Sequence, residues 1–151
     1  MKIWIDGDAC PRPTKEIIFR AATKYNIPVY LVANSFVALP RGPLFKLIQV
    51  GKGDDMADSY IVEHVEADDI VITADIPLAA LIVEKNSVAI NPRGEAYTKD
   101  NVRERLSMRD FMYTLREHGV DTSGPSSHSA KDNQRFANSF NSLLCRVKKL
   151  R

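Results

Sequence analysis

The chain has 151 residues, 44% of them hydrophobic, which is enough for one domain with its own core. Its formal net charge of +2 is too small to indicate a nucleic-acid partner by itself. No apolar run approaches the length of about 18 residues that spans a membrane, and no secretory leader precedes the first predicted strand. We therefore expect a cytoplasmic protein with no membrane partner. Cys10 and Cys145 lie far apart and indicate ordinary thiols, not a disulfide framework or a zinc site.

The first predicted strand ends in two acidic residues. An apolar run from Ile3 to Ile5 is interrupted by Asp6-Gly7-Asp8, and Pro11 stops the strand from continuing. In open parallel α/β sheets, ligands bind beyond the carboxyl ends of the strands, so both acids are candidate site residues. Asp8 has a second interpretation, because it could simply cap a following helix.

Strands and helices alternate along most of the chain. A prolyl first turn and an apolar stripe predict a helix over residues 13–25. We expect further strands at residues 28–33, 45–50, 69–74 and 88–90, and further helices beginning near 55 and 77 and spanning 100–118 and 130–151. Residues 119–129 are rich in Gly, Ser and Pro and predict a loop. This alternation predicts one α/β domain over residues 1–151, with a mostly parallel central sheet of about five strands, helices on both faces and a C-terminal helix.

Two later segments also carry acids at the ends of predicted elements. Asp55 and Asp58 follow a glycine loop, and their i,i+3 spacing gives them a common helix face. Acids are favoured in a first helical turn by the helix macrodipole alone, so a purely structural role for this pair stays open. Asp75 follows the strand predicted at 69–74 and repeats the pattern of Asp6.

The five acids Asp6, Asp8, Asp55, Asp58 and Asp75 would gather at one edge of such a sheet. Converging carboxylates repel one another unless a proton or a cation neutralises them. An all-oxygen ligand set suits Mg²⁺ or Mn²⁺ better than zinc. Metal ions held in this way activate water and neutralise developing charge, so hydrolysis of a phosphodiester fits the pattern best. The chain has no Walker loop and no G-x-S-x-G elbow.

Five motifs carry a resemblance to a known family. They are Ile5-Asp6-Gly7-Asp8-Ala9-Cys10-Pro11, Gly53-x-Asp55-x-Ala57-Asp58, Ile72-Thr73-Ala74-Asp75-Ile76-Pro77-Leu78-Ala79, Asn91-Pro92-Arg93-Gly94 and Arg105-Leu106-x-Met108-Arg109-Asp110. Gly124-Pro125 and Lys131-Asp132 with Phe136 look like a C-terminal signature of the same family. The motifs cover essentially the whole chain and closely resemble the bacterial YaiI/YqxD family. The resemblance implies a PIN-like fold, the three-layer α/β/α architecture of metal-dependent ribonucleases.

The resemblance also bears on the candidate site. In PIN-like nucleases, acids from the first strand, a central helix and a later strand end bind the metals, which supports the same five aspartates as ligands. The family motif does not require an acid at Asp54, so we assign that residue to a solvated loop. We therefore expect a nuclease that acts on RNA with Mg²⁺ or Mn²⁺. Lys15, Arg93 and Arg109 are candidates for phosphate contact.

Two other functions stay open. In a haloacid-dehalogenase-like phosphatase, Asp6 would be the covalent nucleophile and Asp8 the general acid, although Cys10 stands where that motif usually has Thr or Val. In a non-catalytic RNA-binding module, the acids would hold a structural or regulatory metal. RNA affinity would then fall steeply with salt, without cleavage.

Overall fold

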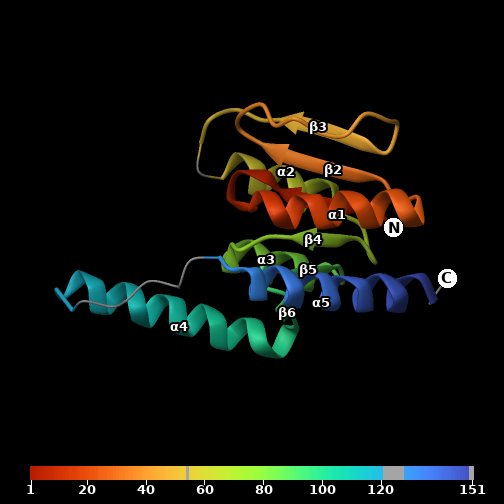
Figure 1. Cartoon of the computed structure of the whole chain (residues 1–151). Helices are drawn as coiled ribbons and strands as arrows, with labels where there is room; N and C mark the ends of the chain where they lie inside the picture. Colours follow the sequence, from red (N-terminus) through yellow and green to blue (C-terminus); the bar gives the residue numbers. More distant parts are fainter. Residues whose placement is uncertain (54, 121–127, 150–151) are drawn as a thin grey trace.

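The computed structural model describes residues 1–53, 55–120 and 128–149, which form a six-stranded sheet with helices on both faces (Figure 1). The strands are β1 (Ile3–Asp6), β2 (Val29–Ala33), β3 (Phe45–Gln49), β4 (Ile70–Ile72), β5 (Val88–Ile90) and β6 (Ala96–Tyr97). The helices are the short 3-10 helix η1 (Gly7–Ala9), α1 (Arg12–Tyr25), α2 (Met56–His64), α3 (Ile76–Glu84), α4 (Lys99–Glu117) and α5 (Ala130–Lys149). The strand order is β3-β2-β1-β4-β5-β6.

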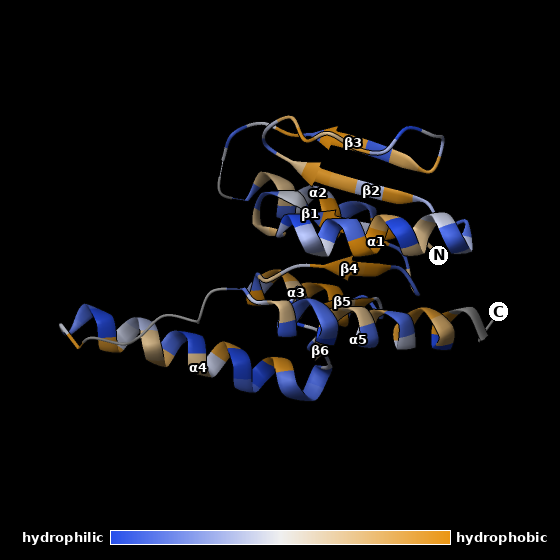
Figure 2. Cartoon of the chain, in the orientation of Figure 1, coloured by the Kyte–Doolittle hydropathy of each residue, from blue (hydrophilic) through white to orange (hydrophobic). Residues whose placement is uncertain are grey.

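Each face of the sheet has its own hydrophobic core, because successive side chains of a strand point to opposite faces. Ile3 and Ile5 of β1 pack in the core that contains α1 and α5, whereas Trp4 packs in the core that contains α2 and α3. All four residues of β1 are buried, as expected for a central parallel strand. The strands are hydrophobic and α4 is hydrophilic along most of its length (Figure 2). The predicted three-layer α/β/α arrangement is confirmed and is consistent with a PIN-like fold.

The order of the strands creates a topological switch point between β1 and β4. β1 pairs in parallel with β2 on one side and with β4 on the other. The chain winds outward from β1 to β2 and β3, then returns through α2 to β4 on the opposite side. Such a reversal leaves a crevice beyond the carboxyl ends of the two strands at the switch point. Asp6 ends β1 and Asp75 follows β4, so both lie at this position.

The structure differs from the sequence-based expectation in two details. β6 pairs antiparallel with β5, which gives six strands where about five were expected. With two residues, β6 is too short to show a hydrophobic period. In addition, α2 begins at Met56, so Asp55 is its N-cap residue and does not lie within its first turn.

The C-terminal helix α5 packs beside α1 on the first core. A capping box begins it: Ser129 N donates to Asp132 Oδ2 at 2.9 Å, and Asp132 N donates to Ser129 Oγ at 3.4 Å. Phe136 and Phe140 of α5 are fully buried in this core. Residues 54, 121–127 and 150–151, which include Gly124 and Pro125, lie outside the described residues. No helix in the described part of the chain is long and apolar enough to cross a membrane.

Candidate functional site

Thr73 connects the ends of the two central strands. Its hydroxyl donates to Asp6 Oδ2 at 3.0 Å and accepts a hydrogen bond from the backbone N–H of Asp75 at 2.9 Å. Thr73 and Asp6 are both buried, with 2% and 7% of their surface exposed. Burial raises the pKa of the Asp6 carboxyl, the hydrogen bond from Thr73 lowers it, and the charges of Asp75 and Asp8 raise it. Asp6 is thus a buried carboxyl held in a defined orientation beside other acids.

Asp75 is held in place by the helix that it begins. It is the N-cap of α3, and its Oδ1 accepts a hydrogen bond from the backbone N–H of Leu78 at 2.9 Å. Pro77 in the first turn is compatible with this start because a prolyl nitrogen has no hydrogen to leave unpaired. The Asp75 carboxylate therefore caps α3 and also belongs to a group of acids with Asp6 and Asp58, which we call the acidic cluster.

Asp58 brings α2 into the same cluster. The pKa of its carboxyl is raised to about 7, first by burial and then by the charges of Asp75 and Asp6. A substantial share of Asp58 is therefore protonated at neutral pH, and a cation could take the place of that proton.

Asp55 lies at the border of the cluster. Its charge contributes to the raised pKa of Asp58, and both residues line a cavity of about 390 Å³ between α2 and α3. Asp55 is the N-cap residue of α2, but its side chain makes no capping hydrogen bond. The cap interpretation therefore does not account for its carboxylate.

Asp8 does not cap α1, whose N-cap residue is Pro11. Its carboxylate instead accepts a hydrogen bond from the backbone N–H of Asn34 at 3.0 Å, just after β2. The Asp8 charge also contributes to the raised pKa of Asp6. Asp8 therefore stands beside the cluster and ties the loop after β2 to the acidic edge of the sheet.

The donor set has the chemistry of a Mg²⁺ or Mn²⁺ site, since it consists of carboxylate oxygens. Among the residues that the structure describes, however, no three His, Cys, Asp or Glu side chains are grouped closely enough to hold a metal ion. Asp58 lies within electrostatic reach of both Asp75 and Asp6. Assembly of a three-carboxylate site would thus require Asp58 to release its proton and the three carboxylates to turn toward a common point.

The three predicted phosphate-binding residues lie in different surroundings. Lys15 lines a groove beside α1. Arg93 forms an ion pair with the buried carboxylate of Asp132 at 3.6 Å, and so connects the turn after β5 to the start of α5. Arg109 lies on α4 and faces Asp110 at 3.6 Å, with about half of its side chain exposed. Of the three, Lys15 has the clearest relation to the acidic edge.

Cys10 follows the first pair of acids but is a poor nucleophile. It is buried, and burial raises the pKa of its thiol to about 12. The charge of Lys15 lowers this pKa and that of Asp6 raises it, so the thiol lies within electrostatic reach of both. At neutral pH Cys10 is therefore a protonated, buried thiol.

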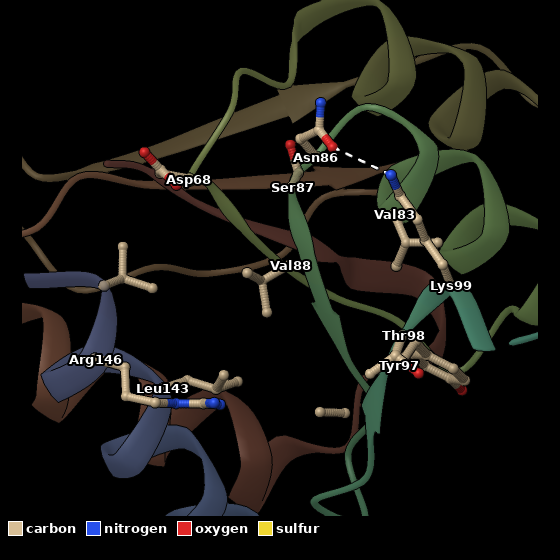
Figure 3. Close-up of a pocket in the computed structure, with 12 residues that line it drawn as sticks. Asp68, Val83, Asn86, Ser87, Val88, Tyr97, Thr98, Lys99, Leu143 and Arg146 are labelled. Atoms are coloured by element: carbon tan, nitrogen blue, oxygen red, sulfur yellow. Dashed lines mark hydrogen bonds between the residues drawn. The ribbon is translucent and has the colours of Figure 1, made fainter. Parts of the chain in front are cut away.

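A separate cavity of about 430 Å³ opens at the opposite edge of the sheet (Figure 3). Val88, the first residue of β5, lies on one side of it, and Leu143 and Arg146 of α5 lie on another. Because it adjoins the beginning of β5, this cavity is remote from the carboxyl ends of the parallel strands. We therefore do not include it in the acidic site.

Sequence reasoning missed the part played by Thr73, although it lies within the motif Ile72-Thr73-Ala74-Asp75. A signal was present, because a hydroxyl residue two positions before an aspartate can accept the backbone N–H of that aspartate. The hydrogen bond from Thr73 to Asp6 spans 67 positions and has no counterpart in any local pattern.

Comparisons with known proteins identify relatives over nearly the whole chain. The profile of a family described as "Uncharacterized BCR, YaiI/YqxD family" matches residues 4–146. The UPF0178 protein of Shewanella sp. strain MR-7 is 56% identical over 148 residues, which cover 98% of this chain and 97% of the relative. The UPF0178 protein of Geobacter metallireducens is 57% identical over 147 residues (97% and 95%), and that of Bordetella petrii is 52% identical over 144 residues (95% and 96%). No solved structure matches the chain significantly.

Proposed function

This chain belongs to the YaiI/YqxD family, and we propose that it is a nuclease that hydrolyses RNA phosphodiester bonds with Mg²⁺ or Mn²⁺. The observation that carries the proposal is that Asp6, Asp58 and Asp75 lie within electrostatic reach of one another near the switch point of a parallel sheet. These carboxyls come from β1, α2 and the start of α3, and their mutual repulsion is relieved by a proton or a cation. The PIN-like character of the fold supports RNA as the substrate. An RNA substrate in turn suggests a cytoplasmic protein.

The residues of the chain divide the work in this proposal. Asp6, Asp58 and Asp75 would hold the metal ion, with Asp8 and Asp55 at the border of the cluster. A bound Mg²⁺ or Mn²⁺ would activate water and neutralise charge on the phosphate. Thr73 orients Asp6 through its hydroxyl, and the backbone of α3 orients Asp75. One oxygen of Asp6 and one oxygen of Asp75 are thus held by hydrogen bonds, which limits how far these two carboxylates must move when a cation binds.

The test is cleavage of labelled single-stranded RNA with Mn²⁺, with Mg²⁺ and with EDTA. We expect cleavage only with a divalent ion and its loss in Asp6→Asn and in Asp75→Asn. Asp110→Asn is the matched control, because Asp110 is an exposed acid on α4. Undiminished cleavage in both site variants would refute the proposal. So would a wild-type protein that cleaves equally well in EDTA.

A non-catalytic RNA-binding module is the second candidate. It is favoured by the absence of three closely grouped ligands among the described residues. In this case the wild-type protein would bind RNA with an affinity that falls steeply with salt, and would leave the RNA intact under every metal condition. The same cleavage assay, run beside a binding assay, separates the two functions.

A further inference from the structure

A groove lies between the beginning of α1 and the loop that follows β2. It has a volume of about 480 Å³ and is lined by Arg12, Lys15 and Phe19 of α1 and by residues 37–40 of the loop. Phe19 and Leu39 contribute apolar surface to the groove, and Arg12 and Lys15 contribute positive charge. Glu16 also lines the groove, so the lining carries one more positive than negative charge.

This groove adjoins the acidic edge of the sheet. The loop starts at Asn34, whose backbone N–H is held by the Asp8 carboxylate at 3.0 Å. On the side of α1, the buried Cys10 lies within electrostatic reach of both Lys15 and Asp6. A hydrogen bond on the side of the loop and the charges felt by Cys10 on the side of α1 thus place the groove near the acidic cluster.

Phe36 is the most exposed large hydrophobic side chain in the described part of the chain, with 76% of its surface accessible. It lies two residues beyond Asn34, at the entrance of the loop that forms the groove. An aromatic ring exposed in this way is a platform on which an unpaired nucleobase can stack, and such stacking is tolerant of sequence. Phe36 is tied to the acidic cluster through the chain, because Asp8 holds the backbone N–H of Asn34 two residues earlier, and this link favours a nucleic acid as the occupant.

Two cations are available for the adjacent phosphates. Lys15 forms no ion pair with an acid within the described residues. Arg12 is 88% exposed, and its contact with Glu16 at 3.8 Å joins two solvent-accessible side chains, so that contact holds it weakly. Both cations lie within one helical turn on α1, a spacing suited to the backbone of a nucleic acid strand.

We propose that this groove binds a single-stranded nucleic acid segment next to the phosphate to be cleaved, with a base stacked on Phe36 and phosphates on Arg12 and Lys15. A duplex does not fit this arrangement, because its bases are stacked on their neighbours and cannot cover the ring. The inference rests on the proposed function for the choice of a nucleic acid, and it adds a binding subsite for the strand next to the acids.

Binding is tested without cleavage, by fluorescence anisotropy of labelled oligonucleotides in EDTA. The probes are single-stranded RNA, single-stranded DNA of the same sequence, and duplex RNA. We expect the wild-type protein to prefer the single strands, and Phe36→Ala to weaken their binding about tenfold or more. Phe36→Trp, which keeps an aromatic face, should bind like the wild type. Phe111→Ala is the matched control, since Phe111 is 58% exposed on α4 and should leave binding unchanged.

The salt dependence of binding tests the cations. Lys15→Gln should reduce the slope of log affinity against log salt by about 0.7, the value for one phosphate contact on a single strand. Equal binding of duplex and single strands, or a Phe36→Ala protein that binds like the wild type, would overturn the inference. The inference would also be overturned if Phe36→Ala abolished self-association of the protein and left RNA binding unchanged, because Phe36 would then serve a protein contact. The binding assay in EDTA is independent of cleavage. If the protein binds single strands as expected but never cleaves RNA with a divalent ion, the proposed nuclease activity is refuted and the binding groove is not.

Discussion

Thr73 Oγ1 donates a hydrogen bond to Asp6 Oδ2 at 3.0 Å, and this contact joins the end of β4 to the end of β1 at the switch point of the sheet. The two residues are 67 positions apart and both are buried. Because the same hydroxyl also accepts the backbone N–H of Asp75, one side chain aligns two of the candidate metal ligands.

Thr73→Val should remove both hydrogen bonds while keeping the shape of the side chain. We expect a loss of stability of about 1–3 kcal/mol, because a buried carboxyl and a backbone N–H lose their partner. The pKa of Asp6 should rise further, since the bond from Thr73 lowers it. Urea denaturation measures the first effect and NMR titration of the Asp6 carboxyl the second. Thr73→Ser keeps the hydroxyl and should retain the wild-type pKa. Equal pKa values in the Val and Ser variants would contradict the role given to Thr73.

Asp75→Asn and Asp75→Ala should separate the two roles of Asp75. Asparagine can still accept the hydrogen bond from Leu78 N, so stability should stay near that of the wild type. Alanine removes the cap and should cost about 1 kcal/mol. Both variants remove the negative charge and should lose divalent-dependent RNA cleavage. Thermal denaturation and the cleavage assay together check this. If Asp75→Asn cleaved RNA as fast as the wild type and only the less stable Asp75→Ala lost activity, Asp75 would be only a helix cap.

Asp58 should make the metal-free protein less stable as the pH rises from about 4 to about 7. Its ordinary pKa is 3.8, and in the fold it is raised to about 7. In this window the folded state therefore holds a proton that the unfolded state has released. The stabilising effect of that proton is fully present below pH 3.8 and is lost as the pH passes through 7.

The effect of Asp58 is measured as the difference in thermal midpoint between the wild type and Asp58→Asn at each pH. This difference removes the contributions of other groups, such as Asp132, whose pKa is lowered chiefly by the backbone N–H of Ser129. The wild type should lose midpoint relative to Asp58→Asn as the pH rises toward 7. Added Mn²⁺ should reverse this loss above pH 7, where Asp58 is ionised. A constant difference from pH 4 to 8 would contradict the raised pKa of Asp58.

Gly94→Ala should displace α5 from the turn that follows β5. Gly94 has a φ of +88°, and an added Cβ would lie 2.7 Å from backbone atoms of Arg135. We expect a loss of about 2 kcal/mol or more, from the left-handed backbone and the clash together. Gly119→Ala is the matched control: its φ is +80°, but no atom of the described residues lies within 4 Å of the added Cβ. It should cost only the backbone strain, about 1–2 kcal/mol. Denaturant midpoints compare the two, and an equal loss in both would show that α5 tolerates the added methyl.

Most of the architecture could be predicted from the sequence, because periodicity and turn residues are local signals. The apolar strands, their short helical connections and the amphipathic C-terminal helix all follow from patterns within about 20 residues. Placement of Asp6 and Asp75 at strand ends also followed, since each acid directly succeeds its own strand. The two-residue strand β6 was missed because it owes its pairing to β5 and not to a pattern of its own.

The partners of the candidate site residues were decided by tertiary structure. The sequence by itself determined that five aspartates follow strands or begin helices, and hence that a parallel sheet would bring several of them to one edge. It could not determine that Thr73 donates to Asp6, that Asp8 binds the backbone of Asn34, or that Arg93 pairs with Asp132. These contacts depend on the order of the strands and on how α2, α3 and α5 pack, because a hydrogen bond between distant residues is set by the relative placement of whole elements, which no local pattern encodes.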